Sequence, residues 1–105
     1  MLFNKKLSGL LGLAQGANKI VYGEIAQKAI ADKKSKLLLI SDKASDRTVE
    51  KLVNRAKYYK KPYQMVDDDI LNHSTGKANK KYLLILDEGF SKAILELYRK
   101  RWRYG

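Results

Sequence analysis

Apolar residues recur at helical spacing in four segments of the chain. They lie at i, i+3, i+4 and i+7 within residues 7–14, 49–56 and 90–97, and a similar stripe runs through residues 25–30. This spacing places the apolar side chains on one face of a helix. The pattern predicts helices that each lie with one side on a sheet.

Continuous apolar runs of strand length lie between these segments. Residues 37–40 and 82–86 are apolar throughout and are bounded by polar residues, a pattern that is typical of strands covered on both faces. The shorter runs at residues 63–66 and 19–22 predict strands nearer the edge of the sheet.

Polar residues, glycine and proline mark the ends of these segments. Ser45 is a predicted N-cap of the third helix, and Pro62 prevents that helix from continuing. The acidic triplet at residues 67–69 would open a short helix that reaches about Thr75, with Gly76 as its stop. The alternation of helices and strands predicts an α/β fold, a three-layer α/β/α sandwich with a four-stranded mixed sheet.

The composition is that of a small, strongly basic protein. The 105 residues are predicted to form one domain (residues 1–105), and they carry 22 Lys and Arg against 11 Asp and Glu, a formal charge of +11. This charge favours a polyanionic partner, nucleic acid first and an anionic membrane second, over a basic protein with no such partner. Cysteine is absent, and we expect neither a membrane-spanning segment nor a signal peptide, which favours a cytoplasmic location.

The turn at residues 16–23 is the first candidate for a binding site. Asn18 could contact a base edge, Lys19 a base or a phosphate, and the backbone N–H groups near Gly23 a phosphate. The same residues would also serve as an ordinary loop between a helix and a strand, with Gly16 at a positive φ and Gly23 near the helix cap. The residues alone leave both interpretations open.

The C-terminal tail, residues 98–105, mixes cations with aromatic rings. Arg99 and Arg101 could neutralise phosphates, while Trp102 and Tyr104 could stack on unpaired bases. The alternative is a solvated extension of the last helix, because cations suit helix C-termini.

Catalytic, metal and cofactor chemistry find little support. The only histidine, His73, has no cysteine or serine elbow motif beside it, so we expect no enzyme activity. The carboxylates of residues 67–69 would suit Mg²⁺ but also complement a helix N-terminus. The glycines Gly9, Gly12 and Gly16 lie in or after a helix, so they do not form a dinucleotide-binding loop. We therefore expect no cofactor and no bound metal.

A series of short motifs from about residue 7 to residue 97 resembles the ribosomal protein superfamily L-seven-Ae/L-thirty-e, small α/β/α proteins that bind kink-turn RNA. The signature of that superfamily, Gly-x-Asn-Glu-x-x-Lys at the first strand and the start of the second helix, is matched here by residues 16–22. The bacterial YlxQ-like branch has a similar opening and last helix. The motifs that carry the resemblance are Leu10–Gln15, Leu37–Asp42, Lys61–Tyr63, Leu71–Gly76 and Asp87–Ile94.

The resemblance implies particular RNA contacts. In the family, one segment reads tandem G·A pairs, and a second segment covers a flipped base. The first segment corresponds here to Gly16, Ala17, Asn18, Lys19, Tyr22 and Gly23, and the second to Val66, Asp67 and Asp68. Two positions depart from the family pattern. Lys19 replaces a glutamate and can only donate hydrogen bonds, whereas Tyr22 replaces a lysine and brings no charge.

The sequence as a whole predicts a monomeric, cytoplasmic, non-enzymatic protein that binds structured RNA. Ribosomal RNA or the ribosome is the expected partner, docked by the Gly/Asn turn and by helix N-termini, with no role for a membrane. The alternative is a protein-interaction module of a ribonucleoprotein or translation complex that does not read RNA sequence directly.

Overall fold

A computed structural model describes residues 2–103 of the chain. Helices and strands alternate in the predicted order. The elements are α1 (Leu2–Gly16), β1 (Ile20–Tyr22), α2 (Gly23–Ala29), β2 (Leu37–Ser41), α3 (Asp46–Tyr58), β3 (Tyr63–Val66), α4 (Asp68–Thr75), β4 (Tyr82–Ile85), α5 (Glu88–Arg99) and the short 3₁₀ helix η1 (Arg101–Arg103).

The sheet has four strands in the order β1-β4-β2-β3. Strand β4 runs antiparallel to both of its neighbours, whereas β2 and β3 are parallel, so the sheet is mixed. The two shorter predicted strands, β1 and β3, lie at the edges, and every residue of the central strand β2 is buried. The predicted four-stranded mixed sheet is confirmed, with the shorter strands at its edges.

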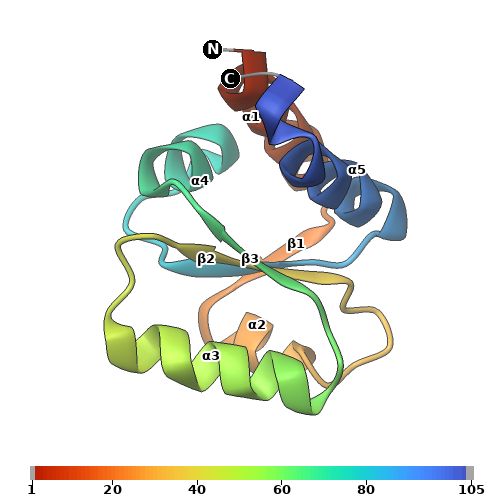
Figure 1. Ribbon diagram of the computed structural model, residues 1–105. Helices are drawn as coiled ribbons and strands as arrows, with labels where there is room; N and C mark the ends of the chain where they lie inside the picture. The colour runs from red at the N-terminus through yellow and green to blue at the C-terminus, as the bar shows by residue number, and fades with distance from the viewer. Residues whose placement is uncertain (1, 104–105) are drawn as a thin grey trace.

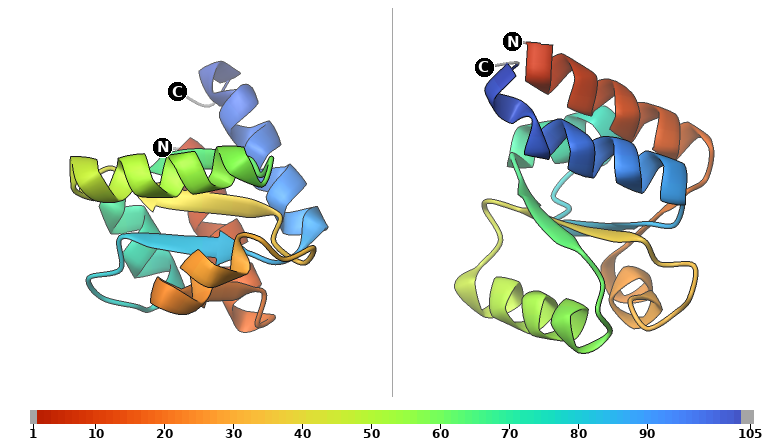
Figure 2. Two further views of the ribbon diagram at one scale, coloured as in Figure 1. Left: turned by 90° about the horizontal axis from the view of Figure 1, so that it is seen from below. Right: turned by 45° about the vertical axis from the view of Figure 1, so that its right-hand side comes forward.

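Helices cover both faces of the sheet. Helices α1, α4 and α5 pack on one face, and α2 and α3 on the other (Figure 1). Along β2, Leu37 and Leu39 belong to the first core, while Leu38 and Ile40 belong to the second, because successive side chains of a strand point to opposite faces. Figure 2 shows α1 and α5 side by side across the first face. The three-layer α/β/α sandwich predicted from the sequence is therefore confirmed.

The helix ends follow the predicted caps closely. The Ser45 hydroxyl accepts a hydrogen bond from the backbone N–H of Thr48 at the start of α3, and the Asp67 carboxylate accepts one from Ile70 at the start of α4. Helix α4 stops at Gly76, which has a φ of 70°, a left-handed conformation that glycine adopts without a steric penalty.

Two local predictions were wrong. Helix α1 continues through Gly16, and the left-handed residue of the following turn is Asn18, with a φ of 58°; asparagine tolerates this conformation better than most residues. The last helix does not run on through the tail. It ends at Arg99, and residues 101–103 form a separate 3₁₀ turn, while the predicted stacking residue Tyr104 lies outside the described residues.

Candidate nucleic-acid interface

One end of the sheet gathers the segments that lead into three helices. Strands β1, β2 and β3 all finish there, and β4 begins there, because Tyr22 pairs with Leu83 and Ile40 pairs with Tyr82. Helices α2, α3 and α4 follow β1, β2 and β3 directly, so their N-termini lie at this end. Side chains cap α3 and α4, through Ser45 and Asp67, whereas α2 has no side-chain cap. Free backbone N–H groups at a helix N-terminus favour anionic groups such as phosphate.

Tyr22 occupies this end of the sheet at the junction of β1 and α2. Its ring is half-buried, and its hydroxyl donates a hydrogen bond to Oε1 of Gln15 in α1. The Lys77 ammonium lies 5.6 Å from the centre of the Tyr22 ring, and the Lys80 ammonium lies 5.9 Å from it. Burial raises the pKa of Tyr22 above its ordinary value, against the opposing effect of a hydrogen bond with Thr75, so the phenol is neutral at physiological pH.

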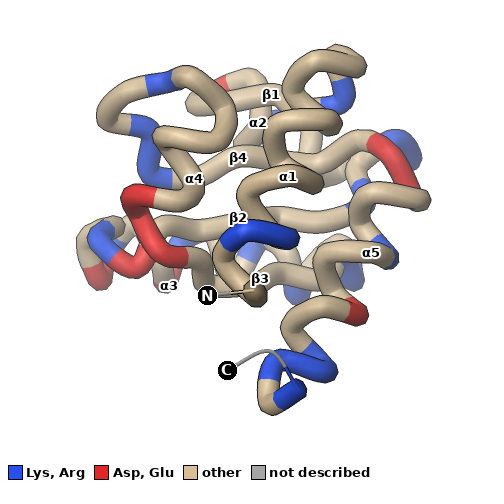
Figure 3. The backbone as a smooth tube through the Cα atoms, turned by 90° about the horizontal axis from the view of Figure 1, so that it is seen from above, with Lys and Arg blue, Asp and Glu red and all other residues tan. Residues whose placement is uncertain are grey.

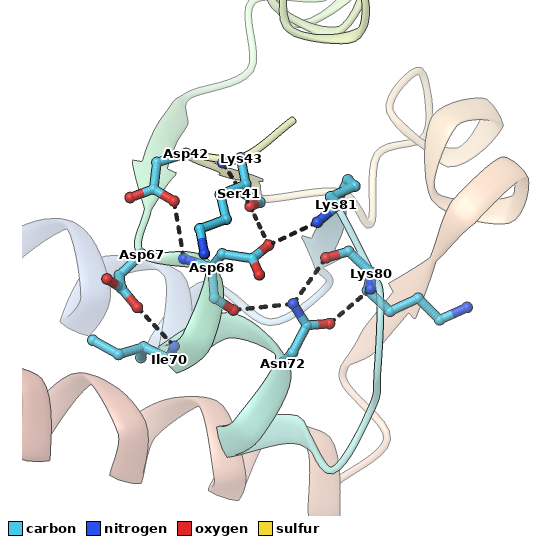
Figure 4. Close-up of polar contacts among 9 residues, drawn as sticks. All are labelled: Ser41, Asp42, Lys43, Asp67, Asp68, Ile70, Asn72, Lys80 and Lys81. Carbon is cyan, nitrogen blue, oxygen red and sulfur yellow. Dashed lines mark hydrogen bonds and ion pairs between the residues drawn. The ribbon is translucent and has the colours of Figure 1, made fainter. Parts of the chain in front are cut away.

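Both lysines come from the loop between α4 and β4, which Asn72 holds in place (Figure 4). The Asn72 amide donates hydrogen bonds of 3.0 Å to the carbonyls of Asp68 and Lys80, and its oxygen accepts one of 2.7 Å from the Lys80 backbone. Within residues 2–103, neither Lys77 nor Lys80 is in ion-pair contact with an acid. We call the group formed by Tyr22, Gly23, Lys77 and Lys80 the Tyr22 edge.

Lys77, Lys80 and Lys81 are not among the residues that the sequence predicted to bind RNA. Their approach to Tyr22 depends on the pairing of β1 with β4, which joins segments far apart in the sequence. The signals that could have revealed the contact were the predicted stop at Gly76 and the predicted strand from residue 82, which together define a short basic loop.

The turn at Gly16–Lys19 lies at the opposite end of β1. Ile20 pairs with Ile85, the last residue of β4, and the Lys19 carbonyl accepts a hydrogen bond of 2.8 Å from the backbone of Leu86. The length of β1, about 10 Å for a strand of this size, therefore separates Asn18 from Gly23. All four residues of this turn, Gly16–Lys19, are exposed. They lie before β1, whereas the family signature extends past the strand to the start of the second helix. Their contact with RNA remains a prediction. The strand predicted at residues 19–22 is present as β1 and separates this turn from the start of α2.

The second predicted segment has structural roles that the structure makes explicit. Val66 is 2% exposed and packs in the core, so its side chain is not available to cover a base. Asp67 caps α4, and Asp68 accepts hydrogen bonds from the Ser41 hydroxyl and, at 3.3 Å, from Lys81 (Figure 4). The bond from Ser41, more than the nearby Lys81, lowers the pKa of Asp68. RNA contacts by Asp67 and Asp68 remain a prediction.

Among residues 2–103, no three acidic or histidine side chains are grouped so that they could hold a metal ion. His73 lies exposed in the last turn of α4. No helix within the described range is long and apolar enough to cross a membrane.

The tail forms a separate group of cations and rings. Arg101 stacks over Phe3 of α1 at 4.5 Å, Arg103 lies 5.1 Å from the ring centre of Trp102, and Trp102 itself is 76% exposed. Arg99 and then Lys100 hydrogen-bond to Glu96, which lowers the pKa of that carboxyl to about 2. Figure 3 shows the tail at a different corner of the molecule from the loop between α4 and β4. The predicted contacts of Arg99, Arg101 and Trp102 with RNA therefore do not form part of the Tyr22 edge.

Curated relatives extend over most of this chain. An RNA-binding protein YlxQ from Bacillus subtilis is 37% identical over 84% of this chain and 90% of its own length. A protein of the same name from Enterococcus faecium is 30% identical over 89% of this chain and 91% of its own length. Both are named as RNA-binding proteins and not as enzymes. No protein-family model matches the chain.

Solved structures share the fold. A Bacillus halodurans protein of unknown function superposes with a TM-score of 0.84 at 29% identity, covering 90% of this chain and 97% of that one. A 15.5 kD RNA-binding protein from Giardia lamblia has a TM-score of 0.71 at 16% identity, with 95% and 88% of the two chains covered, which supports the fold alone. The resemblance to the YlxQ-like branch is confirmed by the first two relatives. Identity of this extent over nearly the whole length shows that the chain belongs to the YlxQ family.

Proposed function

We propose that this chain is a non-enzymatic, monomeric cytoplasmic protein that binds structured RNA of the kink-turn type, within ribosomal RNA or on the ribosome. The observation that carries the proposal is the convergence of Lys77 and Lys80 over Tyr22, beside the start of α2, with neither ammonium group in ion-pair contact with an acid among the described residues. The names of the YlxQ relatives and the formal charge of +11 support the same ligand class.

The Tyr22 edge has the chemistry that a folded RNA requires. Lys77 and Lys80 supply ammonium groups that can contact RNA phosphates, and such contacts position an RNA without reading its sequence. Gly23 has a φ of 61°, and no heavy atom lies within 4 Å of the place that a side chain there would take. The RNA backbone can therefore approach the peptide closely at this point, between the two lysines and the first turn of α2.

The kink-turn part of the proposal is tested with a matched pair of RNAs. One contains an intact kink-turn, and the other carries substitutions that break its G·A pairs. We expect the protein to bind the intact RNA more tightly, with a steep dependence on salt for both. Equal affinity for the two RNAs would contradict kink-turn recognition, and affinity that salt does not affect would contradict RNA binding by charge altogether.

A second candidate function is that of a protein-interaction module. It is favoured by an apolar groove between α1 and α5, which is lined by Leu10, Leu13 and Leu97, with Leu13 65% exposed. Washing the purified protein at high salt separates the candidates. RNA that rebinds after the wash supports the primary proposal, whereas a protein partner that stays bound through the wash supports the second.

A further inference from the structure

A second basic and aromatic surface lies at the C-terminal end of α3, where the loop between α2 and β2 comes alongside. The Lys61 ammonium donates hydrogen bonds of 3.0 Å and 3.1 Å to the carbonyls of Asp32 and Ser35, which holds the two segments together. We call this surface the α3 tip. It comprises residues 32–34 and 55–61.

The α3 tip is strongly positive. Its titratable cations are Lys33, Lys34, Arg55, Lys57, Lys60 and Lys61, against the single carboxylate of Asp32. Lys33, Lys34, Lys57 and Lys60 are exposed. Within residues 2–103, no acidic side chain is in ion-pair contact with any of the six. Cations at a helix C-terminus complement the helix dipole, but that effect accounts for one or two charges and not for the lysines on the adjoining loop.

Aromatic rings stand among these charges. The rings of Tyr58 and Tyr59 meet edge to face, with centres 4.9 Å apart and planes at 84°. The Arg55 guanidinium lies 5.2 Å from the centre of the ring of Tyr59, which is the less exposed of the two tyrosines. Tyr58 is 78% exposed, so a ring anchored on one side projects into solvent. Aromatic rings beside cations are the means by which proteins hold unpaired nucleotides, since every base can stack on a ring.

The α3 tip is distant from the Tyr22 edge. Helix α3 begins at the end of the sheet where Tyr22 lies and runs back towards the other end, on the face that α2 and α3 cover (Figures 1 and 2). Lys77 and Lys80 belong to the loop that leaves α4 on the opposite face. An RNA element seated on one surface therefore leaves the other surface open.

We propose that the α3 tip is a second RNA-binding surface, specific for unpaired nucleotides, on which Tyr58 stacks a base while Lys33, Lys57 and their neighbours neutralise the flanking phosphates. The inference rests on the proposed function only for the class of ligand. A protein with both surfaces joins a folded RNA element to a single-stranded segment.

The test uses a fluorescent single-stranded oligouridine and, in parallel, the kink-turn RNA, with affinity measured by fluorescence anisotropy. Replacing Tyr58 by alanine is expected to weaken oligouridine binding at least about fivefold, because stacking on one ring carries that much affinity. Tyr58→Phe keeps the ring and should restore binding to within about twofold of the original protein.

Charge is tested with a matched pair of double variants. Lys33→Gln with Lys57→Gln should weaken oligouridine binding, and the control, Lys5→Gln with Lys92→Gln, should not, because these exposed lysines of α1 and α5 lie on the other face. An unchanged affinity of Tyr58→Ala for oligouridine would overturn the proposal. Equal weakening of oligouridine binding by both double variants would also overturn it. So would a blunt RNA duplex whose binding depends on Tyr58 to the same extent.

The two RNAs separate this proposal from the first one. Lys77→Gln with Lys80→Gln should weaken the kink-turn RNA and leave oligouridine binding intact, whereas Tyr58→Ala should do the reverse. If the unaltered protein did not bind the kink-turn RNA but bound oligouridine through Tyr58, the proposed function would be refuted. The assignment of single-stranded RNA binding to the α3 tip would then still stand.

Discussion

The sharpest prediction concerns the paired lysines of the Tyr22 edge. The change is Lys77→Gln together with Lys80→Gln, which removes two ammonium groups and keeps side chains of similar length. Neither residue lies in the core, and neither is in ion-pair contact with an acid among the described residues. The Lys80 backbone keeps its two hydrogen bonds to Asn72, so the fold of the loop should survive.

The size of the effect follows from counterion release. Each phosphate contact contributes about 0.7–0.9 to the slope of log affinity against log salt, so losing two should flatten the slope by about 1.4–1.8. If the two proteins bind equally at 1 M salt, affinity falls about 25–60-fold at 0.1 M salt and about 5–9-fold at 0.3 M.

The assay is fluorescence anisotropy with a labelled kink-turn RNA over a series of salt concentrations. Lys5→Gln with Lys92→Gln removes two lysines from exposed positions of α1 and α5, outside the Tyr22 edge, and serves as the control. If the control flattened the slope of log affinity against log salt by the same amount, only the net charge of the protein would matter. A slope that stays unchanged in the Lys77 and Lys80 variant would refute the assignment of RNA binding to the Tyr22 edge.

Three smaller predictions concern stability. Asn72→Ala removes three hydrogen bonds that hold the loop between α4 and β4 and should lower the free energy of unfolding by about 1–3 kcal/mol in urea titrations; an unchanged midpoint would contradict this role. Gly23→Ala meets open space but a φ of 61°, so it should cost about 1–2 kcal/mol through backbone strain alone, and Gly23→Asn less; equal unfolding temperatures for all three proteins would argue against that strain. The lowered pKa of Asp68 contributes stability that is complete above its ordinary value of 3.8 and is lost as the pH falls through its lower value in the folded protein; Asp68→Asn should therefore reduce the loss of stability in acid, and an identical acid limb would exclude this contribution.

Much of the fold could be predicted because the local signals agree with one another. The apolar stripes, the cap at Ser45 and the stop at Gly76 all act over a few residues, and each has the same role in the structure. The continuous apolar run in β2 predicted a strand buried on both faces for a similar reason. Such features depend on periodicity and on backbone preferences, which the sequence displays directly.

The candidate site was harder to predict because it depends on pairing between distant segments. The run at residues 19–22 predicted the strand that separates Asn18 from Gly23, but it did not show which other segments lie beside each end of that strand. Tyr22 and Lys77 are distant in sequence, yet the pairing of β1 with β4 brings them together. The exposed tyrosine of the α3 tip gave no signal of its own, since the amphipathic pattern of α3 explains the helix without it.

The central claim is that RNA is held at the Tyr22 edge, and amide chemical-shift mapping with a kink-turn RNA tests it most directly. The account predicts that the largest changes in the ¹H–¹⁵N spectrum fall on residues 22–25 and 76–81, at the junction of β1 with α2 and in the loop before β4. Changes confined to the tail or to the α3 tip, with residues 22–25 and 76–81 unaffected, would contradict it.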